Sequence, residues 1–248
     1  MQYDFSAARY ARTRREDPAI AAAIRRAIGS AGTLVNVGAG SGSYEPPDLE
    51  VLAVEPSQTL IEQRAFGSAR TVQACAEALP LDDKSFDVGL AVNTVHHWTD
   101  LRRGLRELKR VCRRRIVIFL RDPSVGTPFW LTETYLPALA PLAYMANVVA
   151  TLQDEFENLT WSPVPLPRDC KDGSFCGFWA RPERYLDPEV RRNISNFSMA
   201  ESTYVEEGIA RLQRDITSGA WDERFGHLRT LAELDCGHRI LASEVTEA

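Results

Sequence analysis

The first half of the chain alternates short apolar runs with segments whose apolar residues recur every three or four positions. Short apolar runs indicate buried strands, and the spacing of three or four indicates helices that pack one face against a sheet. Strands that alternate with helices predict a parallel sheet with helices on both faces. The expected strands cover 33–37, 51–54, 71–74, 87–92 and 115–120, and the expected helices cover 19–28, 58–64 and 101–111.

The alternation stops after Asp122. Residues 122–199 are rich in proline and aromatic side chains and show no strand–helix alternation, which predicts an insertion. A helix is expected over 204–218, and two short strands are expected within 228–245, joined at Asp235-Cys236-Gly237.

One segment has the length of a membrane span. Thr134–Gln153 carries no charged residue, and a membrane helix needs about 20 apolar residues. Pro137, Pro141 and Asn147 interrupt it, so we expect a buried or substrate-facing helix and no membrane partner. The arginine-rich N-terminus has no apolar stretch behind it, which argues against a secretory signal and for a cytoplasmic protein.

Charge and cysteine content narrow the function classes. The net charge is −5 with acids and bases mixed along the chain, which argues against nucleic acid as a partner. The five cysteines are odd in number and show no CxxC spacing, so we expect free thiols and no metal site.

A glycine-rich segment, Gly38-Ala39-Gly40-Ser41-Gly42, directly follows the first expected strand. Glycines there let the backbone turn tightly and approach a ligand closely. Ser43 stands where a dinucleotide fingerprint has its third glycine, and the Gly-Lys-Ser/Thr of a P-loop is absent. The spacing therefore favours a cofactor site of another kind.

Glu55 ends the second expected strand. An acidic residue at that place can accept hydrogen bonds from both ribose hydroxyls of a nucleoside, although a solvated strand-end carboxylate is the alternative. Pro46-Pro47 leaves little room for a long helix between the glycine segment and Glu55. The pairing of glycine segment and carboxylate favours the ribose role.

Between about Tyr10 and Pro123 the chain resembles class I S-adenosylmethionine (SAM)-dependent methyltransferases, in the group that includes the ubiquinone and menaquinone biosynthesis enzymes. The resemblance implies SAM as cofactor and a Rossmann-like α/β fold with a mostly parallel seven-stranded sheet. It divides the chain into a SAM-binding core at 1–122 with a gate segment at 1–17, a lid insertion at 123–200, and a C-terminal part of the core at 201–248. The resembling motifs are Gly38-Ala39-Gly40-Ser41-Gly42, Val54-Glu55-Pro56-Ser57, Ala76-Glu77-Ala78-Leu79-Pro80-Leu81, Ser85-Phe86-Asp87 and Val95-His96-His97-Trp98.

The resemblance also implies roles for single residues. Gly38, Ala39 and Gly40 would line the methionine part of SAM. Glu55 would hold the ribose, and Pro56 would pack on the adenine.

Further implied contacts come from other parts of the chain. The turn of Cys75, Ala76 and Glu77 would meet the adenine edge. Asn93 would lie beside the methionine amino group. Tyr10 and Arg14 form a Tyr-x-x-x-Arg pattern in which the guanidinium could pair with the SAM carboxylate.

Two positions depart from the family pattern. Asn36 stands where these proteins most often have aspartate, and Cys75 stands where aspartate commonly meets the adenine amino group. An amide brings no negative charge, and a thiol is a poorer acceptor than a carboxylate. The backbone contacts to SAM do not depend on either change.

The acceptor is expected to be a small, fairly hydrophobic molecule methylated on O, N or C, because the insertion is rich in aromatic residues. His96 and His97 are the possible general bases, needed only if the acceptor must lose a proton. A purely structural role for the two histidines stays open. So do a non-methylating enzyme and a binding protein built on a SAM-binding scaffold.

Overall fold

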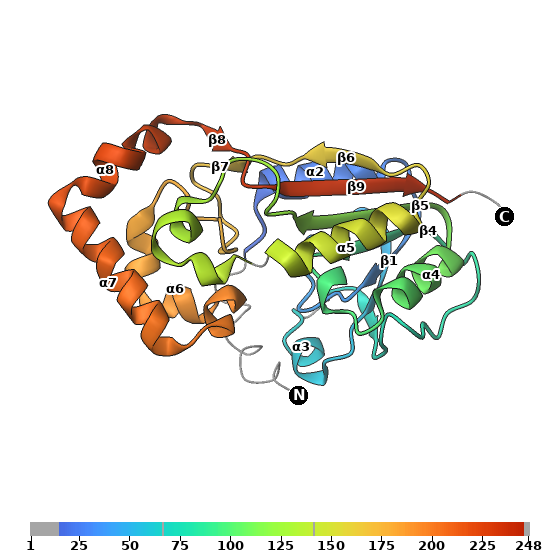
Figure 1. The fold of residues 1–248 in the computed structure, drawn as a ribbon. Helices are drawn as coiled ribbons and strands as arrows, with labels where there is room; N and C mark the ends of the chain where they lie inside the picture. Colours follow the sequence, from blue (N-terminus) through green and yellow to red (C-terminus); the bar gives the residue numbers. More distant parts are fainter. Residues whose placement is uncertain (1–14, 66, 141, 246–248) are drawn as a thin grey trace. The chain divides into compact units, whose positions relative to one another are not determined.

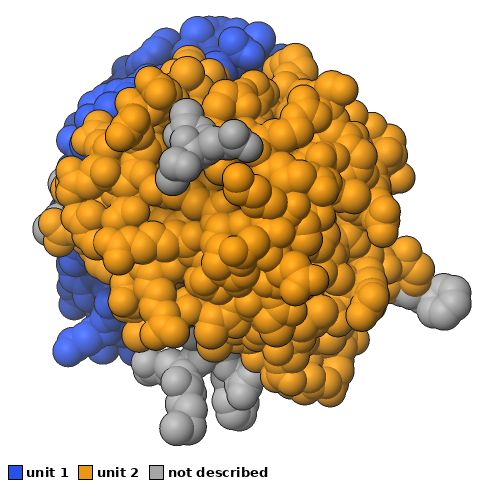
Figure 2. All heavy atoms as spheres, turned by 90° about the vertical axis from the view of Figure 1, so that its right-hand side faces the viewer, with its two compact units in different colours: residues 1–17, 123–142, 165–237 blue, residues 18–122, 143–164, 238–248 orange. Residues whose placement is uncertain are grey.

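The computed structural model describes residues 15–65, 67–140 and 142–245 (Figure 1). The chain forms two compact units, coloured separately in Figure 2. Unit 2 comprises 18–122, 143–164 and 238–248, and unit 1 comprises 1–17, 123–142 and 165–237. Each unit is therefore built from segments that are far apart in the sequence.

A mixed sheet forms the centre of unit 2 (Figure 1). Its strand order is β3-β2-β1-β4-β5-β9-β6, with β1 to β5 parallel and β9 antiparallel to both of its neighbours. The chain order reverses between β1 and β4, so these strands border the switch point where open α/β sheets bind ligands. The strands are β1 Thr33–Val37, β2 Glu50–Val54, β3 Arg70–Val72, β4 Phe86–Val92, β5 Cys112–Arg121, β6 Thr160–Pro163 and β9 His238–Glu244.

Helices cover both faces of this sheet. On one face, α4 (Leu101–Val111) and α5 (Leu142–Glu155) share a core with the strands through residues such as Leu108 and Leu152. On the other face, α2 (Pro18–Ile28) buries Ile20, Ile24 and Ile28. Figure 1 shows α2 on the far side of the sheet from α4 and α5. The three-to-four spacing that predicted α2 and α4 is thus the spacing of their buried faces.

The connection from β1 to β2 has no helix over residues 38–49, all of which are described. Parallel neighbours are usually joined through a helix. Here the connection is a series of turns in which Tyr44, 4% exposed, has φ +63° and lies 6.4 Å from the Phe119 ring, measured between centroids. The short helix α3 (Gln58–Glu62) follows only after β2. The prolines at 46 and 47 had indicated this short connection.

Unit 1 has its own aromatic core. Its helices are α6 (Pro188–Arg192), α7 (Ser202–Ser218) and α8 (Ala220–Phe225), and β7 (Leu166–Pro167) pairs with β8 (Glu233–Leu234). The rings pack edge to face around Trp130, which contacts Tyr185 and Trp221. Most aromatics of the expected lid therefore pack against one another. The rings of this cluster are Phe129, Trp130, Tyr135, Phe175, Phe178, Tyr185, Phe197, Trp221 and Phe225.

The unit bounds differ from the expected division of the chain. Residues 143–164, expected in the insertion, supply α5 and β6 to unit 2, whereas residues 201–237, expected in the core, belong to unit 1. The two strands expected within 228–245 do not pair with each other, because β8 pairs with β7, and β9 pairs with β5 and β6. These assignments depend on pairing between distant segments.

The apolar segment 134–153 does not form one helix. A π-helical turn ends at Tyr135, a 3₁₀ turn spans Pro137–Leu139, and α5 begins at Leu142. Within the described ranges, no helix is both long enough and apolar enough to cross a membrane.

Candidate functional site

The glycine loop lies at the carboxyl ends of β1 and β2. The backbone N–H groups of Gly38 and Ala39 both donate to the Val54 carbonyl, at 2.8 and 3.0 Å. Gly38 has φ +72°, and a Cβ there would lie 2.0 Å from Thr94 Oγ1. Only glycine fits between β2 and Thr94, so the close approach of β4 to the loop requires this residue.

Glu55 is oriented by the loop that it faces. Its carboxylate accepts the N–H of Gly40 at 2.8 Å and the N–H of Ser57 at 2.9 Å, one on each oxygen. The residue is 5% exposed. Each carboxylate oxygen keeps a second lone pair. Glu55 is thus held by two backbone donors and is still able to accept two further hydrogen bonds, as the ribose role requires.

The end of β3 lies beside Glu55 and Pro56. The Glu55 N–H donates to the Val72 carbonyl at 3.1 Å, and Gln73 Nε2 donates to the Pro56 carbonyl at 3.1 Å. Pro56 is exposed, as a residue that packs on a ligand ring would be.

The turn that follows β3 is anchored to α4. Cys75 is exposed, and Ala76 is buried. The Glu77 carboxylate accepts the N–H of Asp100, the N-cap residue of α4, at 3.1 Å. The Glu77 side chain is therefore part of the scaffold that holds this turn.

Backbone strain gathers at the same edge. Asn93, which follows β4, has φ +49° and donates its N–H to the Phe119 carbonyl at 2.7 Å. Tyr44 also has a positive φ. Left-handed backbone is costly for residues other than glycine and persists where the surrounding structure enforces it, often at functional sites.

His96 and His97 form one 3₁₀ turn after β4, with ring centroids 3.9 Å apart. Burial, with a smaller contribution from His97, lowers the pKa of His96 to about 3. Loss of solvent also lowers the pKa of His97 from its ordinary 6.5. The Tyr144 hydroxyl of α5 donates to the His96 carbonyl. Both imidazoles are therefore neutral at physiological pH.

A buried polar group under the glycine loop was not foreseen from the sequence. Asn36 donates to Glu45, and Glu45 forms an ion pair with Arg64. Charged residues in a loop and after a short helix usually face solvent, so their spacing carried no signal. Two predicted residues, Tyr10 and Arg14, lie outside the described residues.

The strand order, the glycine loop at the switch point and the acidic residue directly after β2 together define the class I methyltransferase architecture. Residues 35–120 match the methyltransferase domain family. Over almost its full length, the chain is also 31% identical to a protein of Anabaena variabilis described as a methyltransferase of an antibiotic biosynthesis pathway. The match covers 93% of this chain and 98% of that one, with a TM-score of 0.85.

Two curated relatives are also named as methyltransferases. An uncharacterized methyltransferase of Bacillus subtilis, YcgJ, is 28% identical over 132 residues, which cover 49% of this chain and 48% of that protein. Demethylmenaquinone methyltransferase of Chlorobaculum tepidum is 25% identical over 114 residues, covering 46% and 45%. The matches thus span about half the length of these curated relatives.

The chain belongs to the family of SAM-dependent methyltransferases, and its fold is the one implied by the sequence motifs. SAM is the cofactor of this family. The residues at the carboxyl edge fit it, because Glu55 has free acceptor capacity beside a glycine loop of positive φ.

Proposed function

We propose that this protein transfers a methyl group from SAM to O, N or C of a small, fairly hydrophobic molecule. The observation that carries the proposal is the Glu55 carboxylate, held by the Gly40 and Ser57 N–H groups at the switch point of the sheet. A carboxylate held in this way can accept a charge-assisted hydrogen bond from each of the two ribose hydroxyls, and such bonds are stronger than those between neutral groups.

The proposed contacts to SAM follow the carboxyl edge. Gly38, Ala39 and Gly40 lie along the methionine part, Glu55 accepts the ribose hydroxyls, and the exposed Pro56 packs on the adenine. SAM supplies an electrophilic methyl group, so the protein has to place the acceptor atom in line with it and exclude water.

Other parts of the chain would complete the cofactor site. The turn of Cys75, Ala76 and Glu77 borders the adenine, and Asn93 lies near the methionine end. Arg14, with Tyr10, pairs with the SAM carboxylate in this proposal.

Several features support a small acceptor. The curated relative from Chlorobaculum tepidum is named for methylation of demethylmenaquinone, and the Anabaena protein is described as belonging to an antibiotic pathway. The net charge of −5 disfavours nucleic acid. The aromatic rings of unit 1 pack against one another in its core. The names of these two relatives, and not the aromatic residues of the insertion, therefore support a hydrophobic acceptor.

If the acceptor must lose a proton, His97 is the proposed base. It is more exposed than His96, and a pKa near 3 makes His96 a weak base.

We expect His97→Gln to lower kcat by about 10²-fold or more when the acceptor carries a proton. Because burial lowers the pKa of His97 from 6.5, kcat/KM of the parent should still be level at pH 6.5 and should fall only at a more acidic pH. An unchanged kcat and pH profile in His97→Gln would assign the histidine a structural role.

Calorimetric titration with SAM and with S-adenosylhomocysteine tests the cofactor site. Glu55→Gln should weaken binding by about 10- to 100-fold, because a hydrogen bond to a charged group is worth about 1.5–3 kcal/mol. Glu62→Gln, on α3, is the matched control and should bind like the parent. Equal affinities for Glu55→Gln and the parent would refute the ribose role.

The reaction itself is tested by incubating the protein with SAM and a set of phenols, amines and quinols. Acceptor-dependent formation of S-adenosylhomocysteine together with a methylated product supports the proposal. Conversion of an acceptor without S-adenosylhomocysteine would instead indicate a non-methylating enzyme on this scaffold.

A further inference from the structure

The glycine loop lacks the structural support that a crossover helix usually supplies. In Rossmann-like folds the loop opens a helix whose N-terminus donates N–H groups and a positive dipole to the ligand site. Residues 38–49 contain no helix here. Something else must hold the loop in its conformation.

Arg64, two residues after α3, contacts the glycine loop directly. Its guanidinium donates from Nη1 to the Gly40 carbonyl at 3.3 Å and from Nη2 to Glu45 Oε2 at 2.6 Å. Its side chain is only 4% exposed. A Cβ at Gly42 would lie 3.0 Å from the guanidinium, so loop and arginine are in direct contact.

Asn36 extends this contact into β1. Its Nδ2 donates to Glu45 Oε1 at 3.0 Å, so Glu45 bridges Asn36 and Arg64. The three side chains together are electrically neutral. Aspartate at position 36 would bring a second carboxylate to about hydrogen-bond distance from Glu45 in a buried place, which is strongly unfavourable.

Hydrogen-bonding capacity remains in this group. Asn36 Oδ1 and Arg64 Nε are buried and have no partner among the described residues. Leaving buried polar atoms unpaired is costly, which is typical of a site that is under functional constraint.

We propose that Arg64, Glu45 and Asn36 are positioning residues that hold the glycine loop in its SAM-binding conformation in place of the missing crossover helix. The inference rests on the proposed function for its link to SAM. It explains why asparagine replaces the usual aspartate at position 36: Glu45 already supplies the negative charge, and Asn36 has to donate to it.

The test exchanges the charge between positions 36 and 45. Asn36→Asp, Glu45→Gln and Arg64→Gln each break the network. The double variant Asn36→Asp with Glu45→Gln restores neutrality with the charge moved to β1, since the new amide at position 45 can donate to the new carboxylate at position 36 and accept from Arg64. Two variants are the controls. Asp48→Asn removes an exposed ion pair between Arg25 and Asp48, and Asp48 lies in the same β1–β2 connection. Leu108→Ala creates a cavity beneath α4, where Leu108 is buried.

Two readouts are needed. One is S-adenosylhomocysteine affinity by calorimetry, and the other is hydrogen exchange of the Gly38–Gly42 amides in the ligand-free protein. Each single variant should weaken binding about 10-fold or more and speed exchange of the loop, and the double variant should return to within about 3-fold of the parent. Asp48→Asn should match the parent, and Leu108→Ala should melt earlier with loop exchange and affinity unchanged.

Parent-like loop exchange and affinity in the single variants would overturn the inference, as would a double variant no better than Asn36→Asp. Failure of the parent to bind S-adenosylhomocysteine would instead overturn the proposed function. The exchange data would still show whether the three residues hold the loop.

Discussion

The His96 imidazole links folding to pH through a single side chain. Burial lowers its pKa to about 3 from the ordinary 6.5, so between these values the unfolded chain binds a proton that the folded protein does not. Protonation of the unfolded chain therefore does not affect the free energy of unfolding above pH 6.5, and lowers it progressively as the pH falls from 6.5 toward 3.

We expect the free energy of unfolding of the parent to fall by about 1–2 kcal/mol more between pH 7 and pH 5 than that of His96→Phe. Urea denaturation at both pH values measures this difference. Asp87 does not interfere. Hydrogen bonds from the Gly32 and Thr33 N–H groups and the Arg113 guanidinium lower its pKa from 3.8 to about 2, so its contribution is lost only between those values. Identical losses in parent and variant would show that His96 is protonated freely in the folded state.

Single residues also show the limits of motif reasoning. Glu55 could be singled out because its place after a strand is a local property of the sequence. Arg64 could not be, because its burial depends on where Gly40 and Glu45 come to lie in the folded chain.

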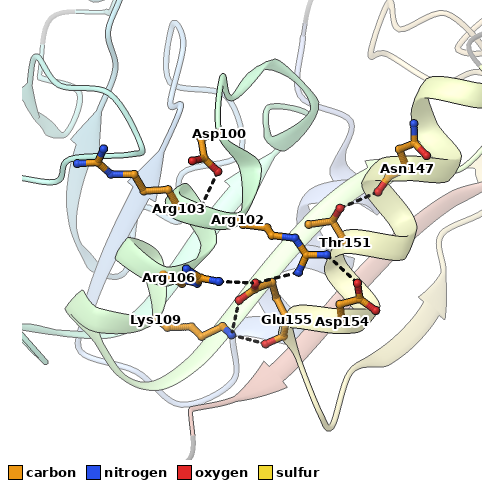
Figure 3. A network of polar contacts seen from close by, with 9 residues as sticks. All are labelled: Asp100, Arg102, Arg103, Arg106, Lys109, Asn147, Thr151, Asp154 and Glu155. Carbon is orange, nitrogen blue, oxygen red and sulfur yellow. Dashed lines mark hydrogen bonds and ion pairs between the residues drawn. The ribbon is translucent and has the colours of Figure 1, made fainter.

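At the scale of elements, α4 and α5 are joined by a charged network, drawn in Figure 3. Glu155 at the end of α5 meets Arg102 at 3.1 Å, Arg106 at 3.5 Å and Lys109 at 3.3 Å, all on one face of α4. Its side chain is 9% exposed. The negative charge of the Glu155 carboxylate therefore offsets the repulsion among the three cations.

Glu155→Gln should lower the free energy of unfolding by about 1–2 kcal/mol, a value discounted because the cations are partly exposed. Thermal or urea denaturation at low salt measures it, and about 1 M NaCl should shrink the difference. Asp154→Asn is the matched control, because Asp154 is 63% exposed and its ion pair is with Arg102. An effect of Asp154→Asn as large as that of Glu155→Gln would mean that the network does not act through Glu155.

At the scale of the whole molecule, the chain builds two cores of different composition. Unit 2 buries aliphatic residues between its sheet and helices, whereas unit 1 buries interlocking aromatic rings around Trp130. The sequence indicated the change at residue 122, where strand–helix alternation ends. It did not indicate that residues 143–164 return to the sheet, because α5 has too little polar contrast between its faces to show its partner.

The sequence by itself determined the order of strands and helices through residue 121, the glycine loop, Glu55 and the family. These depend on spacings within a few residues or on motifs read in order along the chain. Only the tertiary structure decided that β9 inserts between β5 and β6, that Asn36, Glu45 and Arg64 meet under the glycine loop, and that the aromatic residues fill a core of their own. The physical reason is the same in each case, since such pairings join segments whose separation in the sequence leaves no periodic signal.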